Sequence, residues 1–279
     1  MRIISTEIIS AEVRDLFLSS AFLLPQKVIQ RLKQALELET AHIAQSTLKC
    51  LLENANLATS SYTPLCQDTG MAQVVMELGQ EISLEGPPLA QAVEKGIRQA
   101  YEVGFLRKST CHPLTRKNLM DNTPGSLETI IVPGEKLSIW SLAKGGGCDN
   151  KSRLINLSPT SSLEEIKAVV VKAVIEAGPD ACPPLCLGLA IGGSFESAPK
   201  LARRALLELW EEPKMTDEEN DLAQELLHSI NATGLGPMGL GGMTTALGIR
   251  VKIQPTHLAS LPLALNINCH SLRTNYVSF

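Results

Sequence analysis

Segments with helical spacing alternate with apolar segments of strand length in the second half of the chain, and this alternation constrains the fold most strongly. Ser162-Leu-Glu-Glu165 has the pattern of a capping box and predicts a helix that ends before Gly178-Pro179. A continuous apolar run over 185–191 predicts a buried strand. The other elements predicted here are helices over 196–212 and 217–230 and strands over about 244–253 and 261–267. Such alternation without a fixed repeat predicts an α/β fold with mixed sheets and flanking helices.

The first half of the chain carries similar signals. Apolar residues at helical spacing between residues 26 and 54 predict one long amphipathic helix. The segment 71–78 predicts a strand, and the segment 88–101, which opens with proline, predicts a helix. Two apolar segments, 129–132 and 136–142, are separated by Pro-Gly and predict a β-hairpin.

Length and composition exclude several functional classes. The 25 basic and 29 acidic residues give a net charge of −4, which disfavours a general nucleic-acid binder. The N-terminal segment lacks the pattern of a signal peptide, and no segment reaches the roughly 18 apolar residues of a membrane helix. We therefore expect a cytoplasmic protein with neither a nucleic-acid nor a membrane partner. The length of 279 residues predicts one domain over residues 1–279, with sub-lobes allowed.

Three loops each combine a cysteine with helix-breaking or polar residues, and these cysteines are Cys66, Cys182 and Cys269. The chain has seven cysteines, an odd number that disfavours a disulfide framework. The three loops lie far apart in the sequence and lack both the C-x2-C pairs of zinc fingers and the clustered spacing of ferredoxins. Spacing alone leaves two interpretations open: metal ligands, or small buried hydrophobic residues.

Five motifs occur along the chain in a fixed order: CQDTG at 66–70, KGGG at 144–147, CPP at 182–184, GLGPMGLGG at 234–242 and PTHLASLPLALNINCH at 255–270. Together, from about residue 25 onward, they resemble the α subunit, or N-terminal domain, of the class I iron–sulfur fumarate hydratase and L(+)-tartrate dehydratase family. The resemblance implies the fold of that domain. It also implies that Cys66, Cys182 and Cys269 hold a 4Fe–4S cluster. One iron of the cluster then lacks a protein thiolate and can act as a Lewis acid.

The same resemblance implies roles for other residues. His257 and Asp68 are implied to be catalytic and to act on the leaving hydroxyl. The substrate contacts that it implies are Gln67, Arg107, Lys144, Gly146 and Gly147. A guanidinium fork suits a carboxylate, and successive glycine amides can form an anion nest.

Several of these residues also fit simpler interpretations. Asp68 suits an Asx turn before Gly70, and a single histidine such as His257 is often structural. Arg116 competes with Arg107 for the substrate carboxylate. The glycines after Lys144 suit a flexible exit from the hairpin.

Further residues in or near the motifs are not assigned to the chemistry. The segment 234–242 lacks the ending of a P-loop, which disfavours phosphate binding. Cys148-Asp149 replaces the Ser-Glu of many fumarases, and we assign Cys148 no role. His270 follows a predicted ligand, and we expect it to hydrogen-bond to sulfur or backbone.

The sequence therefore predicts the α subunit of a fumarate hydratase that interconverts fumarate and (S)-malate, with L(+)-tartrate dehydratase as the alternative. Lys144 and the segment 256–262 favour fumarate over tartrate in this interpretation. Since the family's C-terminal domain has no counterpart before Phe279, we expect a fumarase β subunit as partner, in an α2β2-type complex. A non-catalytic, cluster-binding interaction module is the alternative from another class.

Overall fold

The computed structural model describes residues 2–211 and 214–279, and it divides the chain into two compact units. Unit 1 comprises Met1–Pro25, Asn54–Gly146 and Arg273–Phe279, and unit 2 comprises Gln26–Glu53 and Gly147–Leu272. Each unit has a mixed four-stranded sheet with flanking helices, so the predicted α/β class is confirmed. That residues 1–279 form a single domain stays a prediction.

Unit 1 is built on a sheet with the strand order β10-β5-β2-β4. Its strands are β2 (Met71–Gly79), β4 (Ser126–Val132), β5 (Leu137–Lys144) and β10 (Thr274–Ser278). Helices α1 (Thr6–Phe22) and α4 (Leu89–Val103) contribute Phe17, Ile97 and Tyr101 to a core shared with Val74 and Ile139 of the sheet. Two short parallel strands, β1 (Arg2–Ser5) and β3 (Ile82–Glu85), complete the unit.

The hairpin predicted from the Pro-Gly turn is wrong. Strand β2 lies between β4 and β5, parallel to β4 and antiparallel to β5. Both flanking strands form, but the turn joins strands that are not neighbours. The reason is that β2 is buried over most of its length and therefore takes partners on both edges.

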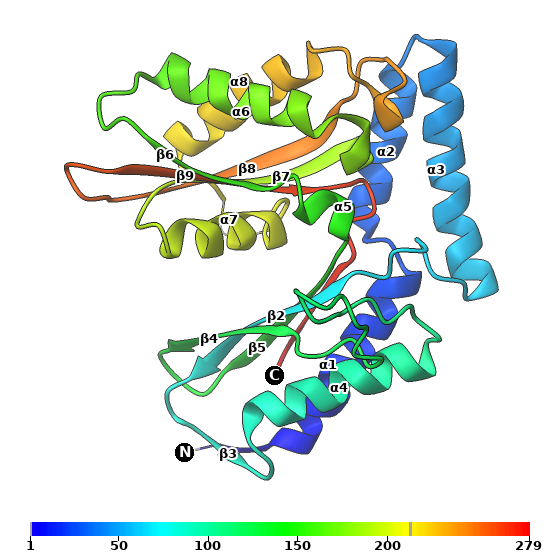
Figure 1. Cartoon of the computed structure of the whole chain (residues 1–279), viewed down its shortest axis with the longest axis vertical. Helices are drawn as coiled ribbons and strands as arrows, with labels where there is room; N and C mark the ends of the chain where they lie inside the picture. The colour runs from blue at the N-terminus through cyan, green and yellow to red at the C-terminus, as the bar shows by residue number, and fades with distance from the viewer. Residues whose placement is uncertain (1, 212–213) are drawn as a thin grey trace. The chain divides into compact units, whose positions relative to one another are not determined.

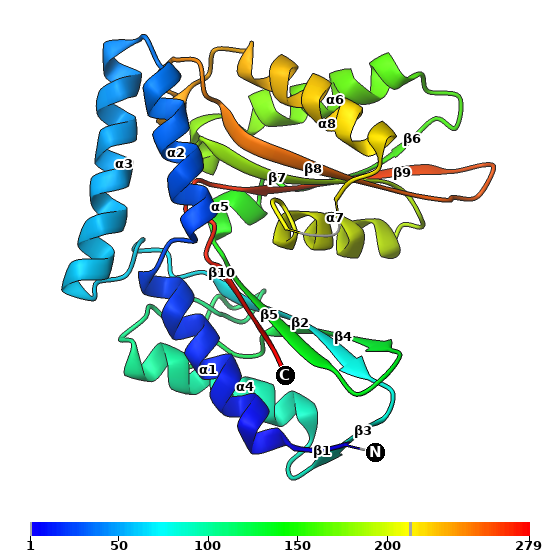
Figure 2. The same cartoon turned by 180° about the vertical axis from the view of Figure 1, so that it is seen from behind.

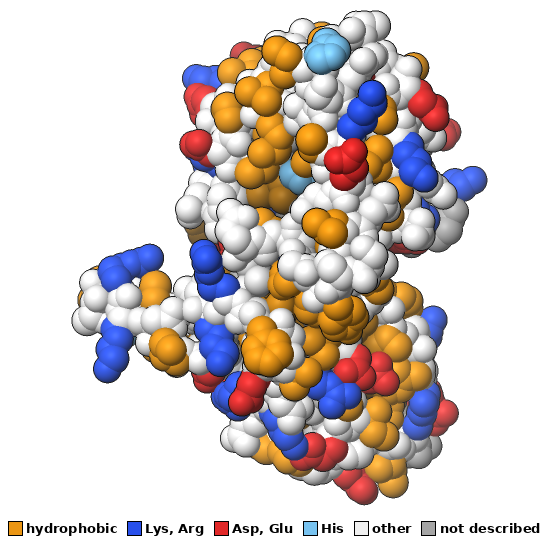
Figure 3. Space-filling view, turned by 90° about the vertical axis from the view of Figure 1, so that its right-hand side faces the viewer, with side chains coloured by type: hydrophobic (Ala, Val, Ile, Leu, Met, Phe, Trp, Pro, Cys, Tyr) orange, Lys and Arg blue, Asp and Glu red, His pale blue; other side chains and the backbone are white. Residues whose placement is uncertain are grey.

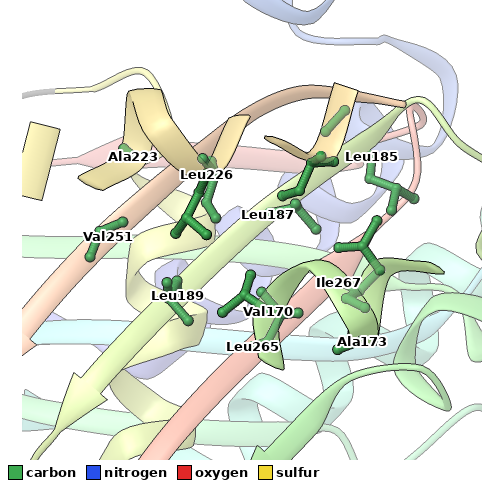
Figure 4. Packing of buried hydrophobic residues seen from close by; sticks show 14 of the residues in the cluster. Val170, Ala173, Leu185, Leu187, Leu189, Ala223, Leu226, Val251, Leu265 and Ile267 are labelled. Carbon is green, nitrogen blue, oxygen red and sulfur yellow. The ribbon is translucent and has the colours of Figure 1, made fainter. Parts of the chain in front are cut away.

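Unit 2 contains a sheet with the order β6-β9-β7-β8. Its strands are β6 (Arg153–Leu157), β7 (Leu185–Gly192), β8 (Ala246–Gln254) and β9 (Leu261–Asn268). Helices α6 (Leu163–Ala177) and α8 (Asp217–Asn231) cover one face, and α7 (Ser197–Leu207) covers the other (Figures 1 and 2). Strand β7 is buried at every position, and Leu187 and Leu189 pack with Val170, Leu226 and Leu265 (Figure 4).

The helix predicted over residues 26–54 is two helices, α2 (Gln26–Leu38) and α3 (His42–Ser61). The break occurs at Glu39, whose side chain is 3% exposed. Its Oε1 accepts hydrogen bonds from the amides of Thr40 (2.9 Å) and Ala41 (3.0 Å), and its Oε2 accepts one from the amide of Met243 (2.7 Å). A carboxylate that takes backbone amides at the start of α3 satisfies the donors that a helix start leaves unpaired.

The other predicted elements form close to their predicted bounds. The predicted capping box of Ser162 with Glu165 is present at the start of α6, and Thr216 with Glu219 forms a second one at the start of α8, which was not predicted. The helix predicted over 196–212 ends at Leu207, and residue 212 lies outside the described residues. The elements not predicted from the sequence are α1, β1, β3, β6, β10, the short helix α5 (Gly146–Asp149) and two 3-10 helices, Gly178–Ala181 and Pro237–Gly239.

One face of the molecule carries charged side chains of both signs. Hydrophobic side chains are interspersed with charged side chains of both signs on the face that Figure 3 displays. Within the described residues, none of the helices combines the length and the hydropathy that a membrane span requires.

Candidate active site

Three of the five motifs meet at one end of the sheet in unit 2. Strand β7 pairs antiparallel with β9, so that Cys186 faces Asn268, and parallel with β8, so that Leu185 faces Ala246. The start of β7, the start of β8 and the end of β9 therefore lie at the same end of the sheet. The Cys182 loop precedes β7, the glycine-rich segment 234–242 precedes β8, and Cys269 follows β9.

The backbone around Cys182 is held by side chains from two other segments. His270 donates from Nδ1 to the carbonyl of Cys182 (3.1 Å), and the Cys148 thiol donates to the carbonyl of Ala181 (3.4 Å). Lys151 pairs with Asp180 (2.8 Å), and this hydrogen bond lowers the pKa of the carboxyl. The backbone bond expected for His270 is thus confirmed, and Cys148 is shown to support the same loop.

His257 lies at the opposite end of β9 from Cys269. It precedes β9, whose eight residues span roughly 23 Å at about 3.3 Å per residue. The imidazole is exposed, and its Nδ1 accepts a hydrogen bond from the amide of Ala259 (3.1 Å). In the neutral ring the proton is therefore on Nε2. The fold of unit 2 does not bring His257 near Cys269.

The aspartate and glycine motifs meet in unit 1. Because β2 pairs antiparallel with β5, Met71 faces Lys144, and the CQDTG loop lies beside the end of β5. The Oδ1 of Asp68 accepts a hydrogen bond from the amide of Gly70 (2.9 Å), and its Oδ2 accepts one from the amide of Gly146 (2.8 Å). Asp68 therefore does form the Asx turn considered from the sequence, and it also joins the two motifs.

Arg273 completes this group, and the sequence analysis did not find it. Its guanidinium donates to the backbone carbonyl of Asp68, and its side chain is 3% exposed. A Cβ on Gly145 would lie 3.3 Å from Asp68 Oδ2 and 3.4 Å from Arg273 Nη2, so only glycine fits easily between them. The signal in the sequence that could have indicated this role is the position of Arg273, four residues after Cys269.

A buried network fixes the remainder of the CQDTG loop. The Tyr101 hydroxyl donates to the carbonyls of Thr69 (2.8 Å) and Gly70 (2.9 Å), and burial raises the pKa of this phenol, which keeps it neutral. The Asn122 amide also donates to Gly70 O (3.1 Å). The Thr69 hydroxyl donates to the carbonyl of Arg107 (2.7 Å), which places Arg107 beside the loop.

The predicted substrate contacts differ in exposure. The side chains of Gln67 and Arg107 are exposed, whereas Lys144 is only 1% exposed. Gly146 and Gly147 are exposed, and the amide of Gly146 is already bonded to Asp68. Arg116, the competitor of Arg107, is exposed and has a positive φ of 58°.

The three predicted cysteine ligands are each half-buried. Cys66 belongs to unit 1, whereas Cys182 and Cys269 belong to unit 2. Within residues 2–211 and 214–279, there is no group of three or more His, Cys, Asp or Glu side chains that could hold a metal ion. The assignment of the three ligands therefore stays a prediction.

Comparisons with known proteins define the family. The model of the fumarate hydratase (Fumerase) family matches residues 10–278. A Methanocaldococcus jannaschii protein, named provisionally as L(+)-tartrate dehydratase subunit alpha, is 37% identical over 267 residues, which cover 94% of each chain. L(+)-tartrate dehydratase subunit alpha of Escherichia coli K12 is 26% identical, over 90% of this chain and 84% of that protein.

A third relative carries the other name of the family. A Geobacillus stearothermophilus protein named provisionally as a class I fumarate hydratase is 27% identical, over 93% of this chain and 52% of that protein. The fold and these matches identify the chain as a subunit of an α/β hydro-lyase. The chain belongs to the class I fumarate hydratase and tartrate dehydratase family, as an α subunit.

Proposed function

We propose that this chain is the α subunit of an iron–sulfur hydro-lyase that dehydrates L(+)-tartrate to oxaloacetate. The observation that carries the proposal is the 37% identity, over 94% of both chains, to a protein named for tartrate dehydration. The sequence analysis ranked fumarate first and tartrate second, and the names of the relatives support the reverse order. Hydration of fumarate to (S)-malate is the second candidate, supported by the G. stearothermophilus relative.

Cys66, Cys182 and Cys269 are the proposed ligands of a 4Fe–4S cluster. Thiolates are the donors that such clusters require, and all three thiols are half-buried on loops. The strand register supports the pairing of two of them, since it brings the Cys182 and Cys269 loops to one end of a sheet. The residues present therefore fit the cofactor. When bound, the cluster supplies a Lewis-acidic iron for the substrate hydroxyl and carboxylate.

Arg107 and the amide of Gly147, an exposed residue, are proposed to bind a substrate carboxylate. The Arg107 side chain is exposed beside the CQDTG loop, and its planar fork can donate two parallel hydrogen bonds. Gln67 is exposed next to Cys66 and offers an amide to a hydroxyl. Gly146 is given a different task from the one implied by the sequence, because its amide supports Asp68. For Lys144, which is buried, we propose support of the glycine loop rather than direct contact with the substrate.

Asp68 is the proposed group that holds or transfers the proton of the leaving hydroxyl. Each of its oxygens accepts one backbone hydrogen bond, which leaves lone pairs for a substrate hydroxyl. The two amides and the Arg273 contact fix the orientation of the carboxylate before a substrate arrives. A fixed orientation reduces the entropy that must be lost on the way to the transition state.

For His257 we propose that it acts in the site of a second copy of the complex. Its position at the far end of β9 argues against a role beside Cys269 of its own chain. We propose that an α2β2-type complex has two-fold symmetry and that the β8–β9 connection of one α subunit enters the site of the other. The exposed imidazole, with its proton on Nε2, can donate to the leaving hydroxyl.

The proposed partner is a β subunit, since two of the relatives are named as α subunits. That subunit is proposed to supply the base that removes the proton from the adjacent carbon. Cytoplasmic location stays a prediction from the sequence.

The test is co-expression with a β subunit of the family and purification without oxygen. The substrates compared are L(+)-tartrate, (S)-malate and fumarate. We expect kcat/KM for tartrate to exceed that for malate by about 100-fold or more, because a site built to bind a second hydroxyl rejects a substrate that lacks it. Cys182→Ser is expected to reduce the visible absorbance of the cluster and its iron content.

Each contrary result has a distinct meaning. Faster turnover of malate or fumarate would replace tartrate by the second candidate. An intact cluster without activity on any of the three acids would favour a non-catalytic, cluster-binding module. Unchanged absorbance in the Cys182→Ser complex would remove Cys182 from the ligand set.

A further inference from the structure

The glycine-rich segment 234–242 is the one motif that the proposed chemistry does not use. It precedes β8, and the strand register brings it to the end of the sheet at which β7 begins. The amide of Leu185 donates to the carbonyl of Thr245 (2.8 Å), which joins the first residue of β7 to a residue three positions after this segment. The segment therefore lies beside the loop that carries Cys182.

The segment contacts the chain both before and after Cys182. The amide of Met238 donates to the carbonyl of Pro183 (2.7 Å). Gly239 lies against Pro179: a Cβ built on this glycine would be 2.5 Å from the Cγ and 2.9 Å from the Cβ of the proline ring. Gly239 also has a φ of +72°, so its backbone conformation and its closeness to Pro179 both require glycine.

The segment is itself firmly held. The amide of Gly236 donates to the Thr245 hydroxyl (3.1 Å), and the amide of Gly241 donates to the carbonyl of Leu235 (2.9 Å). Beyond the segment, the amide of Met243 donates to the buried carboxylate of Glu39 (2.7 Å). A segment that is held in this way can keep the neighbouring Cys182 loop in a fixed position.

The Cys182 loop needs such support because of its own conformation. Cys182 has φ 52° and ψ 62°, the left-handed region that residues with a Cβ rarely adopt. Such a conformation persists where the surroundings impose it. His270 holds the Cys182 carbonyl directly, and the glycine-rich segment holds the prolines on either side.

We infer that the segment 234–242 is a positioning loop that fixes Cys182 for cluster binding, with Gly239 at the decisive contact. The inference rests on the proposed role of Cys182 as a ligand. A residue that supports a ligand in this way typically affects metal affinity by about 10- to 100-fold. The segment is thereby assigned a role in holding the cofactor, in place of the phosphate binding that its glycines suggest at first sight.

The test compares Gly239→Ala with Gly234→Ala in the complex with the β subunit, purified without oxygen. Gly234 has a nearly equal φ of +69°, but a Cβ there meets nothing within 4 Å. The two variants therefore share the backbone strain, and only Gly239→Ala displaces Pro179. The readouts are the rate of iron loss to a chelator, the absorbance of the cluster, and the thermal unfolding temperature of the cluster-free protein.

We expect both variants to lower the unfolding temperature, Gly239→Ala at least as much as Gly234→Ala because of its added contact with Pro179, while Gly239→Ala alone accelerates iron loss by about ten-fold or more. Equal rates of iron loss in the two variants would overturn the inference. If Gly239→Ala does not fold, Pro179→Gly removes the same contact from the other side, and a wild-type rate of iron loss in that variant would overturn the inference as well. Cys182→Ser separates the two proposals: an unchanged cluster in that variant would remove the ligand assignment itself.

Discussion

The carboxylate of Asp68 accepts a hydrogen bond from the amide of Gly146 at 2.8 Å, across 78 residues of the chain. This bond joins the cysteine–aspartate loop to the glycine loop, two motifs that are separate in the sequence. Because this bond occupies the Gly146 amide, Gly146 is proposed to support Asp68 and not to contact the substrate.

Asp68→Asn is expected to reduce kcat of the cluster-loaded complex by about 100-fold or more, as for other acid–base residues. Asn keeps a single carbonyl oxygen, so it can accept from only one of the Gly70 and Gly146 amides, and the charge is lost. Steady-state kinetics with tartrate measure the effect. Asp149→Asn, an exposed neighbour in α5, is the control and should retain near wild-type kcat. Near-normal kcat in Asp68→Asn would leave Asp68 with a structural role only.

Tyr101→Phe is expected to destabilise the chain by about 1–3 kcal/mol, because the carbonyls of Thr69 and Gly70 lose a buried donor. Burial keeps the pKa of this phenol above its usual value, so the loss should be independent of pH up to about pH 10. Urea unfolding followed by circular dichroism measures it. Tyr276→Phe is the control: its ring is 46% exposed, and it should change stability by less than about 0.5 kcal/mol. Equal effects would mean that the hydroxyl of Tyr101 does not support the loop.

Glu208 is expected to make unit 2 sensitive to acid. Burial of this carboxyl acts to raise its pKa, but the Lys252 ammonium (2.8 Å) and Arg204 outweigh burial and hold the pKa below the ordinary value. The stabilisation that ionised Glu208 contributes is therefore complete above its unfolded-state pKa of about 4.3. It is lost as the pH falls through the lower pKa of Glu208 in the folded state.

Glu208→Gln should thus cost about 3 kcal/mol at pH 7, with a smaller difference from wild type near pH 3. Thermal unfolding between pH 7 and pH 3 measures this difference. Glu196→Gln, whose carboxylate is 82% exposed, should follow the wild-type curve. A difference that grows as the pH falls would contradict the assigned sign.

His257→Ala and Cys269→Ser complexes are each expected to be inactive. Mixed after dissociation and reassembly, they should recover about a quarter of wild-type activity, because about half of randomly paired dimers are mixed and each of these holds one complete site. The reason is the position of His257 at the far end of β9 from Cys269. A mixture without activity would show that His257 serves the site of its own chain. Activity in the His257→Ala complex alone would show that His257 has no catalytic role.

Much of the secondary structure could be predicted because its signals are local. The capping box at Ser162 is formed by residues three positions apart, and the apolar run over 185–191 is itself a buried strand. The break at Glu39 could not be predicted, because one of its partners is the amide of Met243, about 200 residues further along the chain.

The sequence by itself determined the family, the types of residue available for chemistry and the alternation of helices and strands, since all of these are patterns along the chain. Only the tertiary structure decided that β2 separates β4 from β5, that Arg273 supports Asp68, and that His257 and Cys269 lie at opposite ends of one strand. The physical reason is that strand order and register arise from hydrogen bonds and burial between distant segments, and local periodicity carries no record of which partner a strand will find.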